Sequence, residues 1–225
     1  MKVFYLILFL FGLNSGSAQL QTITNQTEYP FWINVPETEK TEKQPILIFL
    51  HGKSLSGTDL NRVRRYGVLR AMDKGRKIPA IVIAPQLAKG SWNPDKVLEV
   101  LEYVKKNYNI DESRIYVCGM SLGGYGTLHF AGKHADKITA AVAICGGGNI
   151  SDGCTLSTIP IWIQHGDKDY IVPISESQKV VNAIRKCNEK AKLIFTIIKG
   201  GNHGSVENIF HQDAMYNWLF EQKRE

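Results

Sequence analysis

One serine stands between glycines at residues 119–124, with the sequence Gly-Met-Ser-Leu-Gly-Gly. An apolar stretch typical of a strand, residues 114–118, precedes it, and a small-residue stretch typical of a helix, residues 125–133, follows it. Glycine on either side lets a serine occupy a sharp strand-to-helix turn, which exposes its hydroxyl at the edge of a sheet and at the N-terminus of a helix. The segment therefore predicts that Ser121 is a nucleophile.

A serine hydroxyl is a weak nucleophile at neutral pH and needs a histidine as general base, itself oriented by a carboxylate. When the serine lies on a strand-to-helix turn, the acid follows it in the chain and the histidine follows the acid. This order leaves His203 and His211 as candidates. His203 lies in a glycine-rich loop directly after an apolar run, whereas His211 lies inside a helical pattern. We therefore expect His203 to be the base.

Two aspartates compete for the role of the acid. Asp167 and Asp169 both follow the apolar run 159–164, in the segment His-Gly-Asp-Lys-Asp-Tyr-Ile-Val-Pro. Asp167 suits a turn, where its carboxylate would bond the backbone two residues further on. Asp169 comes after that turn and just before the apolar residues 171–173. We expect Asp169 to orient the histidine.

Attack on a carbonyl also requires N–H donors for the oxyanion that develops. The backbone N–H of Leu122, the residue after Ser121, is one expected donor. The loop at residues 49–54 follows an earlier apolar run and contains Gly52, which allows a sharp turn. The backbone N–H of Lys53 in this loop is the second expected donor. An ordinary strand-to-helix turn is the alternative interpretation of the loop.

Apolar runs of strand length recur along the chain with helical patterns between them. They are continuous rather than alternating, which indicates strands buried on both faces, as in a parallel sheet covered by helices. The pattern predicts a three-layer, doubly wound, mostly parallel α/β sheet, whose sites lie at the carboxyl ends of the strands. The predicted strands cover residues 46–50, 80–84, 115–118, 140–144, 159–164 and 193–198, with residues 29–35 as an extra strand near one edge.

Helix boundaries are also indicated by the sequence. Asn93 and Pro94 supply an N-cap and a first-turn proline for a helix that continues to Tyr108. Ser175 begins another helix, which continues to Lys186. A last helix is predicted from apolar residues that share one face, namely Val206, Ile209, Phe210, Ala214 and Trp218.

The N-terminal segment is typical of a secretory signal peptide. Met1 and Lys2 are followed by an almost unbroken apolar stretch at residues 3–13, and residues 16–18 are small. The apolar stretch is too short to span a bilayer comfortably, and no later segment suggests membrane insertion. We expect residues 1–18 to be removed, leaving one exported domain at residues 19–225 in the periplasm or outside the cell. Its oligomeric state is left open.

The net charge is +6, and much of the excess lies in one basic cluster. An anionic partner is one interpretation of this cluster. The favoured one is the water-facing side of an amphipathic helix whose inward residues include Leu60, Val63, Gly67 and Ala71. The expected export of the protein argues against a nucleic-acid partner. The basic residues are Arg62, Arg64, Arg65, Arg70, Lys74, Arg76 and Lys77.

The four cysteines are Cys118, Cys145, Cys154 and Cys187, and in an exported protein they allow three complete pairings. Cys118 lies inside the predicted strand before Ser121 and is expected to be a buried apolar residue. Cys154 lies in a loop rich in glycine and aspartate and is the one we expect to be bridged. No Cys-x-x-Cys or His-Cys spacing suggests a metal site, so no metal ligand is assigned.

Taken together, these motifs resemble those of the α/β-hydrolase superfamily. Within it, the chain resembles small secreted esterases, which include feruloyl and acetylxylan esterases, polyhydroxybutyrate depolymerase-like proteins and the phospholipase/carboxylesterase group. The resemblance implies a triad of Ser121, Asp169 and His203, an oxyanion hole at Lys53 and Leu122, and no cofactor. The segments that carry it are residues 51–52, 111–124, 165–173 and 201–203.

No long insertion follows the run that ends near Ile144, where many relatives carry a lid. A single α/β-hydrolase domain without a large lid would have an open, shallow site, better suited to a short or polymer-attached acyl ester than to a long lipid chain. Trp92, Tyr125 and Tyr170 are candidates to stack on a sugar or an aryl group, unless they simply pack beneath loops. By analogy, an ester linked to a polysaccharide is a reasonable substrate.

Three classes of function are compatible with these features. A serine carboxylic-ester hydrolase is favoured. A serine peptidase or a thioesterase would use the same triad and differ only in the pocket and the leaving group. A non-catalytic binding module is the third class, and the complete set of Ser121, Asp169 and His203 counts against it.

Overall fold

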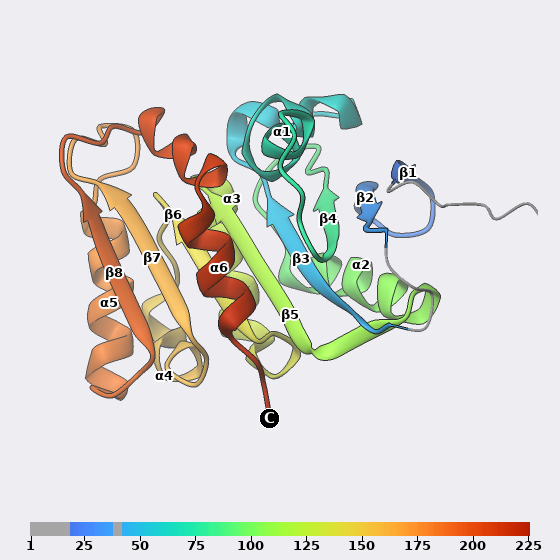
Figure 1. The fold of residues 1–225 in the computed structure, drawn as a ribbon. Helices are drawn as coiled ribbons and strands as arrows, with labels where there is room; N and C mark the ends of the chain where they lie inside the picture. Colours follow the sequence, from blue (N-terminus) through green and yellow to red (C-terminus); the bar gives the residue numbers. More distant parts are fainter. Residues whose placement is uncertain (1–18, 38–41) are drawn as a thin grey trace, which may run out of the picture.

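The computed structural model describes residues 19–37 and 42–225, so the predicted signal peptide lies outside the described residues. Within the described ranges, eight strands form one sheet in the order β1-β2-β4-β3-β5-β6-β7-β8 (Figure 1). The pairs β1–β2 and β2–β4 are antiparallel, and every other pair is parallel. The expected mostly parallel α/β sheet is confirmed.

The six predicted parallel strands all exist, with small differences at their ends. β6 and β8 match their predicted ranges, and β5 is longer than predicted because it already pairs with β3 at Ile110. The predicted extra strand is β2, one position in from the edge. The edge strand itself, β1, has the sequence Gln-Leu-Gln-Thr-Ile and was not predicted, since it lacks an apolar run. The bounds are β1 (Gln19–Ile23), β2 (Phe31–Val35), β3 (Gln44–Leu50), β4 (Ile81–Pro85), β5 (Ile110–Met120), β6 (Ala140–Ile144), β7 (Ile161–Gly166) and β8 (Leu193–Ile198).

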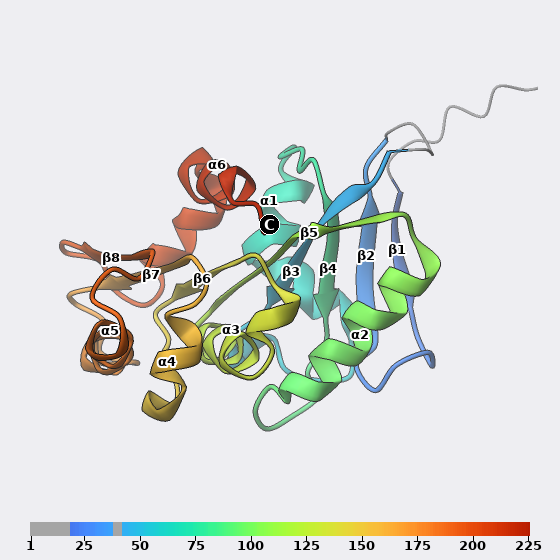
Figure 2. The same ribbon diagram turned by 90° about the horizontal axis from the view of Figure 1, so that it is seen from below.

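Helices cover both faces of the sheet, which completes the three layers (Figure 2). One face carries α2 (Pro94–Asn107), α3 (Leu122–Lys133) and α5 (Ser175–Cys187). The other face carries α1 (Gly67–Asp73) and α6 (Asp213–Glu221). Each layer buries its own apolar cluster against the sheet, and the strand residues of the two clusters point to opposite faces. This burial is the main favourable term that holds the layers together.

The predicted helix starts agree with the structure at two places. The side chain of Asn93 accepts hydrogen bonds from the N–H groups of Asp95 and Lys96, and Pro94 is the first residue of α2. This arrangement satisfies N–H groups that have no partner inside the helix. α5 begins at Ser175 and ends one residue beyond its predicted end.

The prediction of one helix through the basic cluster was wrong. Residues 60–73 instead form a 3-10 helix, η2 (Leu60–Arg65), followed by α1 after a break at Tyr66. Tyr66 is extended, and Gly67 has φ +78°, where a Cβ atom would lie 2.1 Å from the ring of Phe49. Two of the basic side chains form ion pairs with acidic residues of the fold, which reduces the charge free for another molecule. These pairs are Arg64 with Asp73 and Arg76 with Asp213.

The prediction of one continuous face for the last helix was also wrong. The chain forms a 3-10 helix, η5 (Ser205–His211), and then α6, with extended backbone at Gln212 between them. Because of this break, Ala214 is exposed rather than inward-facing. The buried face of α6 consists of Met215, Tyr216 and Leu219.

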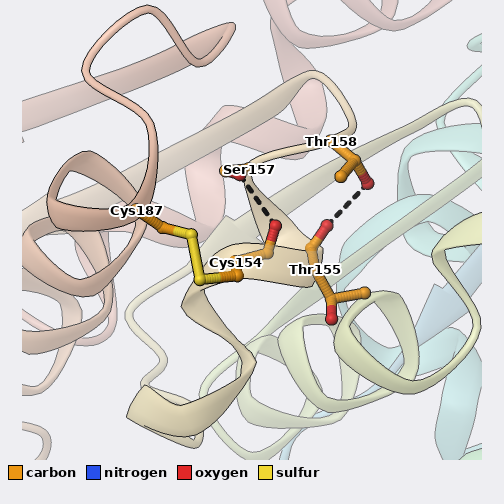
Figure 3. The surroundings of a disulfide bond; sticks show 5 residues. All are labelled: Cys154, Thr155, Ser157, Thr158 and Cys187. Atoms are coloured by element: carbon orange, nitrogen blue, oxygen red, sulfur yellow. Dashed lines mark hydrogen bonds between the residues drawn. A yellow bond between two sulfur atoms is a disulfide. The ribbon is translucent and has the colours of Figure 1, made fainter.

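A disulfide joins Cys154 to Cys187, linking the short helix α4 (Gly153–Leu156) to the end of α5 (Figure 3). The expectations that Cys154 is bridged and that Cys118 is buried are confirmed, while the choice of Cys187 as the partner had been left open. Between β6 and β7 the chain forms only α4 and the 3-10 helix η4 (Ile150–Asp152), so no large lid interrupts this connection. None of the helices in the described ranges has the length and apolarity that a transmembrane helix requires.

Candidate active site

Ser121 lies on the sharp turn that the sequence predicts, between the last residue of β5 and the first residue of α3. Its backbone has φ +59° and ψ −124°, a region that a residue with a side chain rarely adopts. The N–H of Ser121 donates to the carbonyl oxygen of Ile144 at 2.8 Å, and its own carbonyl accepts from the N–H of Tyr125 at 3.0 Å. These bonds hold the strained turn at the carboxyl end of the sheet.

The glycines around the serine are required by close backbone contacts. A Cβ atom on Gly123 would lie 1.8 Å from the carbonyl oxygen of Leu50, and one on Gly119 would lie 2.4 Å from the carbonyl oxygen of Gly123. The first turn of α3 therefore packs directly against the end of β3. This contact brings the loop after β3, which contains Lys53, next to the turn that carries Ser121.

His203, in the loop after β8, contacts Asp169, in the loop after β7. Nδ1 of His203 donates to Oδ2 of Asp169 at 2.7 Å, and Oδ1 of Asp169 accepts from the N–H groups of Ile171 and Val172 at 2.9 Å each. The Asp169 side chain is fully buried. Burial alone would raise the pKa of this carboxyl, but the hydrogen bonds it accepts, led by those from Val172 and His203, hold its pKa below the usual value. Asp169 is therefore ionised at neutral pH and fixes the orientation of the imidazole.

The sequence suggested that Asp167 bonds the backbone two residues further on, but the structure gives it a different partner. Its Oδ1 accepts from the N–H of Gly200 at 2.6 Å. Gly200 precedes His203 in the loop after β8, so Asp167 ties the loop of the acid to the loop of the histidine. The discrimination between the two aspartates agrees with the geometry, because only Asp169 contacts His203.

His165 supports the same loop from inside the core. Its Nδ1 lies 2.7 Å from Oγ of Ser177, and its Nε2 lies 2.9 Å from the carbonyl oxygen of Val172 and 3.5 Å from Oδ2 of Asp169. Burial is the main cause that lowers the pKa of this histidine. These contacts connect the Asp169 loop, through Val172, to Ser177 at the start of α5. Chain order had excluded His165 as the base, and this positioning role depends on packing that sequence does not reveal.

The loop after β3 is oriented by His51, which had also been excluded as the base. Its Nε2 accepts from the N–H of Leu87 at 3.1 Å, so Nδ1 carries the proton and donates to the carbonyl oxygen of Gly52 at 2.8 Å. Burial lowers the pKa of His51 to about 4, which keeps the ring neutral. The peptide bond from Gly52 to Lys53 is trans, so the N–H of Lys53 points away from His51.

Lys53 and Leu122 each begin a helix, at η1 (Lys53–Leu55) and α3 respectively. The N–H of a first helical residue has no partner inside its own helix. Both groups are thus suited to bind an oxyanion next to Ser121, as the sequence suggested.

One pocket of about 330 Å³ contains the predicted nucleophile, base and loop donor. Nδ1 of His203 is bonded to Asp169, which leaves Nε2 for a partner in the pocket. Among the described residues no hydrogen bond joins Nε2 to the Ser121 hydroxyl, and in free enzymes this contact is often long until substrate binds. The pocket is lined by Lys53, Ser54, Tyr66, Met120, Ser121, Ile171, His203, Gly204 and Glu207.

The three aromatic candidates lie at different depths, and none of them lines this pocket. Trp92 is buried, with its indole N–H donating to the carbonyl oxygen of His51 at 3.0 Å. Tyr125 is half-buried, and its hydroxyl lies 3.4 Å from Oε2 of Glu176. Both line a neighbouring hollow of about 480 Å³ that also touches Leu122. Tyr170 is 87% exposed and precedes Ile171, which does line the pocket.

Among the described residues, Cys145, His165 and Asp169 form a group whose possible ligand atoms lie within 4.8 Å of one another. Each is already engaged. Both ring nitrogens of His165 have hydrogen-bond partners, and Asp169 accepts from three donors. Burial raises the pKa of Cys145 to about 12, so its thiol stays protonated. These side chains therefore suit the support of the histidine better than metal ligation.

The model of the phospholipase/carboxylesterase family matches residues 92–216, more than half of the chain. The chain belongs to this family. The matched residues include all three members of the predicted triad.

Two curated relatives are similar in sequence. The chain is 30% identical over 185 residues to the probable feruloyl esterase C of Aspergillus terreus, a match that covers 75% of this chain and 67% of the relative. It is 35% identical over 85 residues to the bifunctional acetylxylan esterase/xylanase XynS20E of Neocallimastix patriciarum. That match covers 37% of this chain and 12% of the relative, so the chain corresponds to a small part of the larger protein.

Solved structures with this fold include a thermostable esterase and a ferulic acid esterase. The thermostable esterase is 30% identical with a TM-score of 0.79, covering 93% of this chain and 64% of that one. The ferulic acid esterase is 16% identical with a TM-score of 0.69, covering 91% of this chain and 98% of that one. The second likeness bears on the fold alone.

Proposed function

We propose that this protein hydrolyses carboxylic esters through a covalent acyl-enzyme on Ser121. Nε2 of His203 removes the proton from the Ser121 hydroxyl as Oγ attacks the ester carbonyl. The N–H groups of Lys53 and Leu122 bind the oxyanion of the tetrahedral intermediate. The intermediate collapses, the ester C–O bond breaks, and the alcohol leaves with the proton that His203 holds. His203 then activates water, which releases the acid and restores Ser121.

The observation that carries the proposal is the 2.7 Å bond between Asp169 and His203, beside a pocket that His203 shares with Ser121. The buried carboxylate stabilises the imidazolium that forms during proton transfer and fixes the tautomer that leaves Nε2 free to accept. Family membership supports ester hydrolysis as the reaction.

We propose short-chain or aryl acyl groups, carried on a small alcohol or a polysaccharide, as the substrates. A pocket of about 330 Å³ accommodates a small acyl group more readily than a long lipid chain. The named activities of the feruloyl and acetylxylan esterase relatives point in the same direction. The exposed position of Tyr170 next to the pocket leaves it free to contact a bulky alcohol portion.

Export is proposed as well, and the disulfide between Cys154 and Cys187 supports it, because such bridges persist in oxidising compartments. Expression with the native N-terminus tests this: the exported protein should begin at Gln19. A protein that keeps residues 1–18 and remains inside the cell would contradict export.

The reaction is tested by a panel of p-nitrophenyl acetate, butyrate and octanoate, a feruloyl methyl ester and acetylated xylan, with Ser121→Ala as the control. We expect hydrolysis by the wild type only, and faster turnover of acetate and butyrate than of octanoate. A wild type no more active than Ser121→Ala on every ester would overturn the proposal. Activity confined to peptide amides or thioesters would replace it with the corresponding acyl-transfer class.

A further inference from the structure

A tyrosine hydroxyl lies beside the loop that supplies one of the expected oxyanion donors. Oη of Tyr66 accepts hydrogen bonds from the N–H of Gly52 at 3.0 Å and from the hydroxyl of Ser54 at 3.3 Å. Tyr66 also lines the pocket that contains Ser121 and His203. The Tyr66 hydroxyl therefore contacts this loop at Gly52, the residue immediately before Lys53.

The hydroxyl is also close to the nucleophile. A Cβ atom built on Gly52 would lie 2.5 Å from Oη of Tyr66 and 3.4 Å from Cβ of Ser121. The Tyr66 hydroxyl and the Ser121 side chain are thus separated by about the width of a methyl group. A side chain at position 52 would collide with the Tyr66 hydroxyl, so this close approach requires glycine.

The position of Tyr66 is fixed by its backbone. It forms the extended break between η2 and α1, with φ −153° and ψ 178°. The next residue, Gly67, packs against the ring of Phe49, and its N–H donates to Oε1 of Glu207 at 2.9 Å. A donor held in this way needs little reorganisation when charge develops on the substrate, which is the condition for strong electrostatic catalysis.

The phenol proton is available to the pocket. A phenol has one proton, and its oxygen can accept hydrogen bonds. The N–H of Gly52 can only donate to Oη, and the Ser54 hydroxyl can donate to it as well, so neither contact requires the phenol proton. Burial, with a smaller contribution from the charge of Glu207, raises the pKa of Tyr66 above its ordinary value, although its two hydrogen bonds oppose the shift. The group is therefore a hydrogen-bond donor at neutral pH and not a base.

We propose that Tyr66 is a catalytic residue whose hydroxyl donates a hydrogen bond to the oxyanion of the tetrahedral intermediate, beside the N–H groups of Lys53 and Leu122. This inference rests on the proposed ester hydrolysis. The phenol keeps its proton throughout, so the proton transfers between Ser121, His203, the alcohol and water are unchanged. Its contribution is a third donor aimed at the charge that appears when the carbonyl π bond opens.

The first test compares Tyr66→Phe with Tyr103→Phe. Tyr103 is also half-buried and lies on α2, away from the pocket, so its variant is a matched loss of a hydroxyl. Active sites are counted with a fluorophosphonate, and kcat and KM are measured with p-nitrophenyl acetate. Removal of an oxyanion donor lowers kcat by about 100-fold or more. We expect such a loss for Tyr66→Phe with KM little changed, and a matching loss of affinity for a trifluoromethyl ketone, which forms a tetrahedral adduct with the serine.

A second variant preserves the shape of the side chain. Incorporation of 3,5-difluorotyrosine at position 66 keeps the hydroxyl but lowers the pKa of the phenol. A donor role predicts that kcat falls as this phenol ionises, at a pH where wild-type kcat is still constant. If the hydroxyl only accepts bonds to position Gly52, ionisation strengthens those bonds and no such decline appears.

A Tyr66→Phe variant whose kcat per active site lies within threefold of the wild type would overturn the inference. So would a loss of kcat that leaves ketone affinity unchanged, because that pattern belongs to a disturbed loop. An unaltered pH profile for the difluorotyrosine protein would also overturn it. Inactivity of both the wild type and Tyr103→Phe would instead refute the proposed ester hydrolysis.

Discussion

Cys154 and Cys187 are both exposed, so replacing both with serine removes the disulfide with little loss of packing. The bridge closes a loop with a sequence separation of 33 residues. In the chain-entropy account, a cross-link of this span lowers the entropy of the unfolded chain by about 12.5 cal/mol/K, which stabilises the folded state by about 3.7 kcal/mol at 25 °C. For a domain of this size, that corresponds to a fall of about 7 to 15 °C in Tm when the bridge is lost.

Urea and thermal unfolding, followed by circular dichroism, measure the effect. The double serine variant should unfold at lower urea and lower temperature than the wild type. A reductant should bring the wild type to the level of the variant and leave the variant unchanged, because Cys118 and Cys145 are free and buried. Turnover per active site at 25 °C should stay within twofold of the wild type, since neither bridged cysteine lines the pocket of Ser121.

Two results would refute the reasoning about the bridge. A loss of less than about 1 kcal/mol would show that the cross-link does not constrain the unfolded chain as the entropy account requires. A reductant effect as large in the double serine variant as in the wild type would show that the destabilisation does not come from this bridge.

Three further predictions concern the acid, the turn and the response to low pH. In Asp169→Asn the side-chain oxygen still accepts from the two backbone N–H groups, so the amide NH₂ faces Nδ1 of His203 and forces the imidazole proton onto Nε2. We expect kcat to fall by about 10⁴-fold, and a loss below tenfold would contradict the role assigned to Asp169. Gly123→Ala places a Cβ atom 1.8 Å from the carbonyl oxygen of Leu50. We expect the free energy of unfolding to fall by about 3 kcal/mol or more and fluorophosphonate labelling to be lost, and a fully stable, fully labelled variant would contradict the packing argument. Burial alone would raise the pKa of Asp111, but its hydrogen bonds lower it to about 2, so its contribution should be complete above about pH 4 and lost as the pH falls through 2. Asp111→Asn should cost about 1 kcal/mol at pH 6 after allowance for solvent screening and only a small part of that near pH 2, and an equal cost at both pH values would contradict this origin.

The sheet was largely predictable because its parallel strands are apolar on both faces. β6 is a continuous apolar run and β8 is apolar except for Thr196; both lie between polar or glycine-containing segments, and their limits were predicted correctly. β1 was missed because alternate polar residues suffice for a short antiparallel strand at an edge. The two incorrect helix predictions have one cause: apolar spacing continued through residues 60–71 and 206–218, while extended backbone at Tyr66 and Gln212 broke the helices.

The triad candidates were accessible to sequence reasoning because each lies directly after a strand of the sheet. A parallel sheet gathers such positions at one edge, so Ser121, Asp169 and His203 could be selected from chain order together with their setting in the loops after strands. The supporting residues were not accessible in this way. His51 acts through contacts with Gly52 and the distant Leu87, which exist only after the chain has folded.

Tyr66 illustrates the same limit within a segment whose fold was predicted incorrectly. An amphipathic helix through residues 60–71 would place its hydroxyl on a helix surface. The extended break turns it toward Gly52 instead. The aromatic residues chosen because they lie near strand ends or near Ser121 do not line the pocket of Ser121, whereas Tyr66, which was not chosen, does.

The central claim is that Ser121 is the nucleophile, and its covalent adduct tests this most directly. The protein is treated with a fluorophosphonate, digested, and mapped by mass spectrometry, with Ser121→Ala treated in parallel. The account predicts one adduct per chain, located on Ser121 and absent from the variant, with labelling that parallels the loss of esterase activity. An adduct on another residue, or an unlabelled wild type that still hydrolyses esters, would contradict it.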